Sequence, residues 1–270
     1  MVSNDIINRF EKDGAVCIRG AVDNDDIKNL LSNLDLLIND DEDRWTTNRI
    51  GGFSDRHLWP TMPWMYDFCA HTKLPEIAGL LMRSRTARLF FDHTFIRDPG
   101  TSHATPWHQD QPYWPFQGNQ IISAWVSLTK SNPFSSGLRF IQGSSQWKKI
   151  FQPTAFGKDS ASSKFLDGSN DYEKMPDFDS KSDEFKIIDW EMEPGDTIFF
   201  GAYAIHGSTK NQDKKNRRAA ISIRYVGDDA RWDPRDGTDP IIDQDKVSIN
   251  PGDPPFDDKW FPEVWSRESR

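Results

Sequence analysis

The chain has 270 residues and a formal net charge of −9, and 36% of its residues are hydrophobic. That length is enough to bury a full core in one large or two modest domains. No apolar run approaches the roughly 18 residues that suggest a membrane span. The acidic balance argues against a nucleic-acid partner, because phosphate binding needs a basic surface. We therefore expect a polar globular protein that neither spans a membrane nor binds nucleic acid.

The two cysteines, Cys17 and Cys69, have apolar sequence neighbours and indicate no disulfide framework. The first residues lack the basic flank and apolar block of a secretory signal, and the last residues show no recognisable targeting address. We therefore expect buried, reduced thiols and a cytoplasmic location.

Residues 1–86 are expected to form a mainly helical N-terminal flank. Ser3 can cap a short helix that Gly14 ends, and residues 15–19 read as a short apolar strand. A second helix opens at residues 23–26, with its apolar residues on one stripe.

Three further segments complete this flank. The acidic run at residues 40–43 is expected to be a solvated loop. Residues 45–66 are rich in Trp, Gly and Pro and have no clear period, so we expect an ordered loop that could lie over a pocket. Lys73 to Met82 has the apolar spacing of another amphipathic helix.

From Ala87 the hydrophobic period changes to two, which is typical of β-strands. In the first strand, one face would carry Leu89, Phe91, His93 and Phe95, and the other Phe90, Asp92, Thr94 and Ile96. Further short strands are predicted at residues 121–128, 137–142, 185–190, 197–200 and 218–225. Short strands separated by Gly and Pro turns indicate a sandwich or barrel, so we expect a β core over residues 87–226.

Two irregular segments remain. Residues 152–185 are polar and lack a sustained period, which favours a mobile lid inserted into the core. Residues 227–270 are rich in Asp and Pro but contain several aromatic residues, so we expect this tail to wrap around the core. Because no clean linker divides the chain, we expect a single domain over residues 1–270.

The stretch from Thr105 to Trp114 contains His108 and Asp110, two residues apart. In an extended backbone, both side chains would leave the strand on one face. His206, far along the chain, is the best candidate for a third ligand. Two histidines and one carboxylate on one face of a metal are typical of non-haem Fe(II) oxygenases. Alone, each motif has a simpler explanation, such as a surface hydrogen bond for the pair or a core position for His206, and His93 is expected to be structural.

An arginine follows at the place where a metal-bound cosubstrate would need one. If 2-oxoglutarate chelates the metal, its far carboxylate is buried and needs a fixed donor, and the planar arginine fork can supply two hydrogen bonds. Arg217 and Arg218 open the strand that follows His206.

With these residues in view, the sequence resembles the phytanoyl-CoA dioxygenase family of Fe(II)/2-oxoglutarate oxygenases. The matching motifs extend over most of the chain: Asp13 to Val16, Arg19-Gly20, Pro106 to Asp110, the strand with Trp125, Gly137 to Ser144, Pro194 to Asp196, His206 to Ser208, the Arg218 strand and Gly227 to Arg231. The resemblance implies a mainly β, double-stranded β-helix (jelly-roll, cupin-like) core with flanking N-terminal α-helices.

The resemblance also implies the site. It makes His108, Asp110 and His206 the iron ligands, and it places Trp125 and Ser208 in the 2-oxoglutarate pocket. The cofactors would be Fe(II), with 2-oxoglutarate and O2 as cosubstrates. The choice of arginine stays open. Arg217 has the spacing from His206 that is common in the family, whereas Arg218 shares a strand face with small and polar residues suited to a cavity. Strand register varies less easily than turn length, so we favour Arg218.

The expected reaction is hydroxylation of an unactivated C–H bond in a small organic molecule, with release of succinate and CO2. Related halogenases lack the carboxylate, so Asp110 favours hydroxylation over halogenation. Gln142 to Ser145 departs from a common family motif, but not at a ligand position. The alternatives are desaturation, cyclisation or epimerisation by the same site, a different metal-dependent reaction, and ligand binding without catalysis. The primary substrate and the oligomeric state are not determined by the sequence.

Overall fold

Two antiparallel β-sheets form the centre of the computed structural model, which describes residues 2–40, 52–153, 172–181, 183–239 and 241–267. The larger sheet has the strand order β1 (Ala15–Ile18), β9 (Thr197–Gly201), β6 (Ile121–Ser127), β11 (Arg218–Val226), β3 (Thr86–Arg97) and β13 (Glu263–Ser266), and β2 (Gly52–Arg56) also pairs with β3. The smaller sheet has the order β4 (Thr105–His108), β10 (His206–Ser208), β7 (Leu138–Ile141) and β8 (Ile187–Asp189). A short pair joins β5 (Phe116–Gln117) to β12 (Arg231–Trp232).

An apolar layer fills the space between the two sheets. Trp125 and Ala220 of the larger sheet belong to one buried cluster with Leu138 and Phe140 of the smaller sheet. Each sheet therefore buries one face against the other. This is the jelly-roll architecture expected, and its inner layer is where the candidate metal ligands lie.

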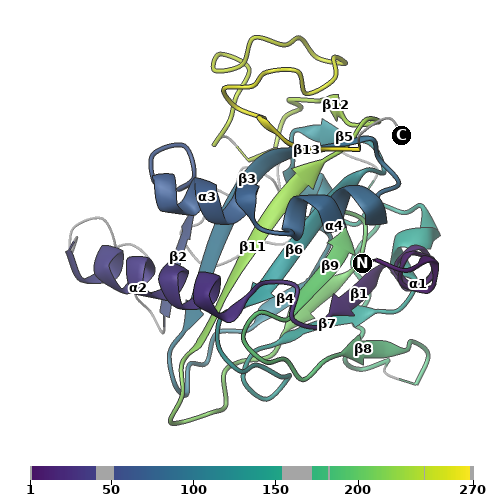
Figure 1. Cartoon of the computed structure of the whole chain (residues 1–270). Helices are drawn as coiled ribbons and strands as arrows, with labels where there is room; N and C mark the ends of the chain where they lie inside the picture. Colours follow the sequence, from purple (N-terminus) through teal and green to yellow (C-terminus); the bar gives the residue numbers. More distant parts are fainter. Residues whose placement is uncertain (1, 41–51, 154–171, 182, 240, 268–270) are drawn as a thin grey trace.

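In the part of the chain that the structure describes, four helices precede β3, and three of them lie over the outer face of the larger sheet (Figure 1). These three are α2 (Asn24–Asp40), α3 (Pro63–His71) and α4 (Leu74–Leu81). Leu34 and Ile77 of this helical layer pack in one cluster with Ile221 and Ile223 of β11. The outer face of β11 is therefore apolar because helices cover it.

The first helix, α1 (Asn4–Asp13), has the ends expected from the sequence. The Ser3 side chain accepts a hydrogen bond from the Ile6 amide at 3.4 Å, and Gly14 ends the helix in the left-handed conformation with φ +81°. Glycine is suited to that position because it has no Cβ to clash there.

The helix predicted at residues 73–82 is also confirmed, as α4. The loop predicted at residues 45–66 is only partly confirmed, because among its described residues only 57–62 lie outside a helix or strand. Gly52–Arg56 is strand β2, and α3 begins at Pro63. Gly52 to Arg56 has no apolar alternation, and it is a strand because it pairs antiparallel with β3. Residues 41–51, which hold the rest of this loop and most of the acidic run at 40–43, lie outside the described residues.

The predicted alternation along β3 is interrupted at Phe90. Arg224 pairs with Phe91, but the next residue, Tyr225, pairs with Leu89, so Phe90 is an extra residue in a bulge. A bulge shifts the side chains on one side of it to the opposite face. Leu89 consequently packs under the helices with Tyr225, and not on the face of Phe91.

The tail packs on one end of the sheets, where Figure 1 shows it in yellow. Trp232 and Phe261 are buried in a cluster with Phe90 and Phe116, and β13 pairs with β3. Phe256 remains 67% exposed. Most of the tail's aromatic residues therefore hold it against the core, as expected.

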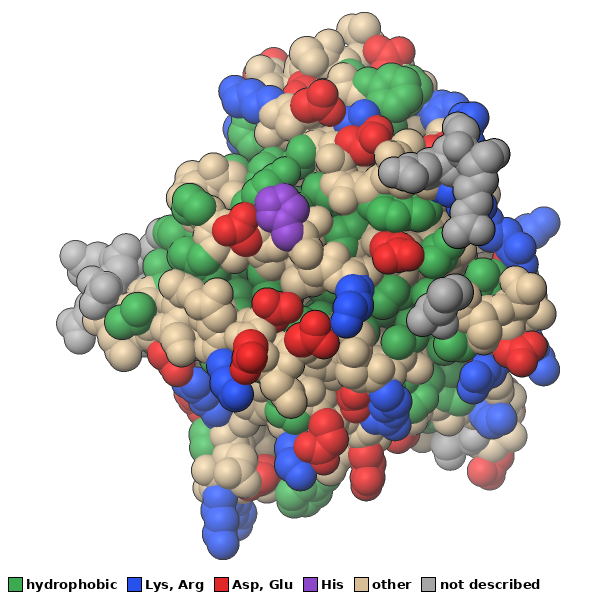
Figure 2. Space-filling model, in the orientation of Figure 1, with side chains coloured by type: hydrophobic (Ala, Val, Ile, Leu, Met, Phe, Trp, Pro, Cys, Tyr) green, Lys and Arg blue, Asp and Glu red, His purple; other side chains and the backbone are tan. Residues whose placement is uncertain are grey.

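The predicted lid lies largely outside the described residues, which omit 154–171 and 182. At one end of it, Phe151 forms a parallel bridge with Glu173, and Phe178 is fully buried beside Trp107. The described residues contain no helix that is long and apolar enough to cross a membrane. On the face seen in Figure 2, acidic and basic side chains are interspersed among apolar ones.

Candidate metal centre

Neighbouring strands of the smaller sheet bring the two candidate histidines together. His108 ends β4 and His206 begins β10, and the two are direct cross-strand partners. Their ring centroids are 4.2 Å apart. Two residues separated by almost a hundred positions thus meet because of strand pairing.

Asp110 completes the group, but not as an extension of the strand. β4 ends at His108, and Asp110 has φ −77° and ψ −32° at the start of the 3-10 turn η1 (Gln111–Tyr113). The expectation of one extended strand that presents both side chains is therefore wrong. The Asp110 amide donates to the Ala202 carbonyl at 3.1 Å, and this hydrogen bond holds the turn that places the Asp110 carboxylate beside the two histidines.

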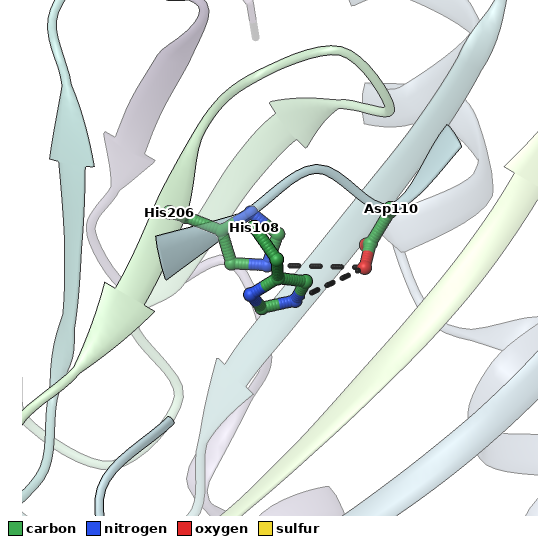
Figure 3. A group of neighbouring side chains, drawn as sticks. All are labelled: His108, Asp110 and His206. Atoms are coloured by element: carbon green, nitrogen blue, oxygen red, sulfur yellow. Dashed lines mark ion pairs between the residues drawn. The ribbon is translucent and has the colours of Figure 1, made fainter. Parts of the chain in front are cut away.

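The three side chains converge on one point (Figure 3). Asp110 Oδ1 is 3.5 Å from His108 Nε2 and 3.9 Å from His206 Nε2. One donor atom from each residue lies within 4.8 Å of the others, and all three residues are buried. This donor set fits a divalent metal held on one side.

The backbone sets the orientation of both rings. His108 Nδ1 is 2.9 Å from the Pro106 carbonyl, and His206 Nδ1 is 3.0 Å from the Ala204 carbonyl. A carbonyl only accepts, so each Nδ1 carries the proton and donates, and each Nε2 presents a lone pair toward the carboxylate side. A hydrogen bond from the second ring nitrogen is the usual way in which metal-binding histidines are held.

The electrostatic surroundings also suit a metal. Burial, and then the adjacent His108, lower the pKa of His206 to about 3. For Asp110, burial alone would raise the pKa, but the electrostatic effects of His206, His108 and the Arg224 guanidinium outweigh it, and the pKa falls below its usual range. Neutral imidazole and ionised carboxylate are the forms that bind metal ions.

Neighbouring side chains hold these groups in place. Phe140 stacks on the His206 ring at 5.6 Å and 22°, and the Phe200 ring lies 4.6 Å from it. Ser123 Oγ of β6 donates to Asp110 Oδ2 at 3.3 Å. Gln109 donates to the Tyr203 carbonyl at 2.9 Å, which ties the loop that carries Asp110 to the turn before His206.

The two candidate arginines lie in different environments. Arg218 is 3% exposed, and its guanidinium donates to the Phe95 carbonyl at 3.1 Å and to Ser136 Oγ at 3.2 Å. The Arg217 side chain is 41% exposed and forms an ion pair with Asp35 of α2 at 2.7 Å. The structure thus directs Arg218 between the sheets and Arg217 outward.

Arg218 has no compensating carboxylate among the described residues. Its Nε is buried without a partner. Burial, and then the like charge of its cross-strand partner Arg97, lowers the pKa of Arg218. A buried guanidinium in this condition is suited to an anionic ligand.

Both predicted pocket residues lie close to Arg218. The Trp125 ring centroid is 5.6 Å from the guanidinium carbon. Ser208 Oγ is 3.3 Å from Ser136 Oγ, which in turn accepts a hydrogen bond from Arg218. His93, expected to be structural, lies 2.8 Å from Ser54 Oγ and packs on Phe95.

The sequence reasoning missed four residues around the site. Ser123 contacts Asp110, Ser136 contacts Arg218, Arg97 is the cross-strand partner of Arg218, and Arg224 is the cross-strand partner of Ser123. The shared strand face of Arg218 and Arg224 was a usable signal. Ser136 had none, because it lies in a turn with φ +66°.

Comparison with known proteins identifies the family of the chain. A jelly roll with two histidines and a carboxylate on one inner face defines a class of metal-binding β-proteins. The family model for phytanoyl-CoA dioxygenase (PhyH) matches residues 10–219. The chain therefore belongs to the phytanoyl-CoA dioxygenase family.

Curated relatives support that assignment. A probable phytanoyl-CoA dioxygenase of Caenorhabditis elegans is 29% identical over 174 residues, which span 62% of this chain and 52% of that protein. The peroxisomal phytanoyl-CoA dioxygenase of Rattus norvegicus is 27% identical over 175 residues, or 62% of this chain and 47% of that protein. These matches span about half the length of the curated relatives.

Solved structures show the same fold. The 2-oxoglutarate-dependent carbocyclase SnoK superposes with a TM-score of 0.73 at 17% identity, over 98% of this chain and 97% of that one. The epimerase SnoN, in complex with Fe3+, 2-oxoglutarate and nogalamycin RO, superposes with a TM-score of 0.73 at 18% identity, over 97% and 98%.

Proposed function

We propose that this protein is an Fe(II)/2-oxoglutarate-dependent dioxygenase that hydroxylates an unactivated C–H bond of a small organic molecule. The observation that carries the proposal is the convergence of His108, Asp110 and His206 at one buried point, with both Nδ1 atoms bound to carbonyls. The family to which the chain belongs supports this activity.

In this proposal, each ligand has a role that its contacts support. His108 and His206 would bind Fe(II) through Nε2, and Asp110 would bind it through the carboxylate that Ser123 orients. Three protein ligands on one side leave the opposite side of the metal for the cosubstrates. Because Asp110 provides a carboxylate ligand, hydroxylation is favoured over halogenation.

Arg218 would bind the distal carboxylate of 2-oxoglutarate, beside Trp125 and Ser208. It is buried, lacks a carboxylate partner among the described residues and lies on the inner face of β11. Arg217 is the less suitable residue, since its charge is already paired with Asp35 at the surface.

The reaction would combine the substrate, 2-oxoglutarate and O2, and release hydroxylated substrate, succinate and CO2. When bound, the iron would couple the oxidation of the C–H bond by O2 to the conversion of 2-oxoglutarate to succinate and CO2. The protein would contribute ligand orientation and the exclusion of water by the aromatic side chains around His206. Desaturation, cyclisation and epimerisation would use the same residues, because the outcome depends on the position of the substrate.

An anaerobic titration tests the cofactor assignment. Fe(II) and then 2-oxoglutarate are added to wild type and Asp110→Ala, and the weak visible charge-transfer band of the chelate is recorded. We expect the band in wild type and its loss in the variant. Absence of the band in wild type that has bound metal would contradict the oxygenase proposal and favour another metal reaction or a binding role. Product mass then distinguishes hydroxylation, which adds one oxygen atom, from the other outcomes.

We further propose a cytoplasmic location and a small-molecule substrate. Both cysteines are free thiols, as expected in a reducing compartment. Fractionation of cells that express the tagged protein tests the location.

A further inference from the structure

We propose that Arg224 binds an anionic group, a carboxylate, of the organic substrate, and so selects carboxylic acids over neutral molecules. This inference rests on the proposed function, because it assigns the substrate class of the same site. Four observations on Arg224 support it: its place beside the metal ligands, its burial, its missing partners and its separation from Arg218.

Arg224 lies next to the metal centre. It is the cross-strand partner of Ser123, whose hydroxyl donates to Asp110 Oδ2 at 3.3 Å. The guanidinium carbon is 5.6 Å from the ring of Trp114 and 4.6 Å from that of Phe91. The residue before Trp114, Tyr113, has its ring 6.2 Å from that of His108. Arg224 therefore belongs to the same wall as the ligands.

The charge of Arg224 is buried with little compensation. The residue is 6% exposed, and the hydrogen bond found for its guanidinium runs from Nη1 to the Ser222 carbonyl at 3.0 Å. Its Nε is buried without any hydrogen-bond partner. Among the described residues, no carboxylate forms an ion pair with it. Burying an unpaired charge is costly, so this arrangement suits a site that an anion completes.

A structural arginine in the same sheet, Arg88, also has a buried Nε without a partner, but it differs from Arg224 in its ion pairs. Arg88 of β3 is 8% exposed, but it forms ion pairs with Asp258 at 2.7 Å and with Glu263 at 3.2 Å, and it donates to the Phe261 carbonyl at 2.9 Å. The contrast shows that this fold can pair a buried arginine when its role is to hold the tail. Arg224 lacks such partners.

Neither Asp110 nor 2-oxoglutarate accounts for the charge of Arg224. Asp110 is the first of three carboxylates whose charge acts on Arg224, but it is assigned to the metal. Of the other two, Asp92 accepts hydrogen bonds from the Leu58 and Trp59 amides, and Asp239 is paired with Arg56. Arg218 and Arg224 are six residues apart on one strand, or roughly 20 Å between Cα atoms. A single 2-oxoglutarate molecule, chelated to the metal and paired with Arg218, has no carboxylate left for Arg224. A second anion would give Arg224 the direct ion pair that it lacks among the described residues, and the substrate is the remaining ligand of the site.

The test uses the anaerobic Fe(II)–2-oxoglutarate complex, without turnover. Hexanoate, decanoate, 3-phenylpropanoate and N-acetyl-leucine are titrated against their primary amides, and the perturbation of the chelate band is measured. In wild type, we expect at least one acid to act at a concentration about tenfold or more below that of its amide, because a charge-assisted hydrogen bond is lost in the amide. Arg224→Gln should reduce that preference to less than twofold, and Arg224→Lys should restore part of it.

Thermal unfolding of the metal-free protein separates a ligand role from a structural one. Arg88→Met should lower the melting temperature, because it leaves two carboxylates unpaired, whereas Arg224→Met should leave it unchanged or raise it. A marked fall in Arg224→Met would show that Arg224 is structural and would overturn the inference.

The two proposals fail in different ways. Absence of the chelate band in wild type would refute the oxygenase function itself. A normal band with no acid preferred over its amide, or a preference that survives in Arg224→Gln, would overturn the role of Arg224 alone.

Discussion

Replacement of Arg218 and of Arg217 by alanine gives a direct test of how the cosubstrate is held. Arg218 is 3% exposed and unpaired with any described carboxylate, whereas the Arg217 side chain is 41% exposed and paired with Asp35. Only Arg218 is placed to meet a buried carboxylate between the sheets. We therefore expect the two neighbouring substitutions to have very different effects on 2-oxoglutarate binding.

The magnitude follows from the hydrogen bonds lost. A hydrogen bond to a charged group contributes about 1.5–3 kcal/mol, and truncation also leaves the ligand carboxylate unpaired. A loss of about 3 kcal/mol corresponds to a roughly 100- to 200-fold rise in Kd. For Arg217→Ala, an exposed ion pair is worth about 0.2–1 kcal/mol to stability, and the Kd for 2-oxoglutarate should change less than about twofold.

The assay is the anaerobic titration of each Fe(II)-loaded variant with 2-oxoglutarate, followed by the chelate band. Circular dichroism melts of both variants show whether they are folded. Arg218→Lys is the third variant, and it should recover only part of the affinity because the ammonium cannot form the planar fork. Near-wild-type binding by Arg218→Ala, together with weak binding by Arg217→Ala, would refute the reasoning and assign the cosubstrate to Arg217.

Three further predictions concern the metal, acid stability and the core. Asp110→Ala should weaken Fe(II) binding by at least about 100-fold, since even the groups that only orient ligands contribute 10- to 100-fold; isothermal titration of the apo-protein measures this. Asp196 accepts hydrogen bonds from the Gly20 and Glu193 amides, at 2.8 and 2.9 Å, and from the Arg19 side chain. These bonds outweigh the effect of burial and lower the pKa of Asp196. The ionised Asp196 should therefore stabilise the fold by about 2 kcal/mol at pH values above the unfolded pKa near 4, and this stabilisation should be lost as the pH falls further. In urea melts, the difference in stability between wild type and Asp196→Asn should accordingly become smaller in acid. A difference that grows in acid would contradict this. Ile221→Ala should cost about 2–5 kcal/mol in urea melts, because Ile221 is fully buried under the helices, whereas Leu36→Ala, at a side chain that is 60% exposed, should cost far less.

Much of the fold was readable because it depends on local signals. The Ser3 cap, the Gly14 stop and the apolar stripe of α4 act within one or two turns of helix, and the structure has all three. The strand predicted at residues 121–128 is likewise present as β6, with Ile122, Ala124 and Val126 packed against the helices. Such patterns need no knowledge of distant residues.

The errors arose where distant segments decide the outcome. β2 is a strand because β3 offers it a hydrogen-bonding edge, and the bulge at Phe90 depends on the register of β3 against β11. Neither feature leaves a period in its own segment. The same limit applies to Asp110, whose carboxylate reaches the histidines through a turn that is held by the Ala202 carbonyl and not through an extended strand.

By itself, the sequence determined the class of fold and the set of candidate ligands, because hydrophobic period, turn residues and the His108, Asp110 and His206 motifs are properties of short segments. Tertiary structure decided how those groups meet. It paired His108 with His206 across two strands, directed Arg218 inward and Arg217 to the surface, and left Arg224 buried beside Asp110 with Nε unpaired. These outcomes depend on strand register and on burial, which are set by residues far away in the chain.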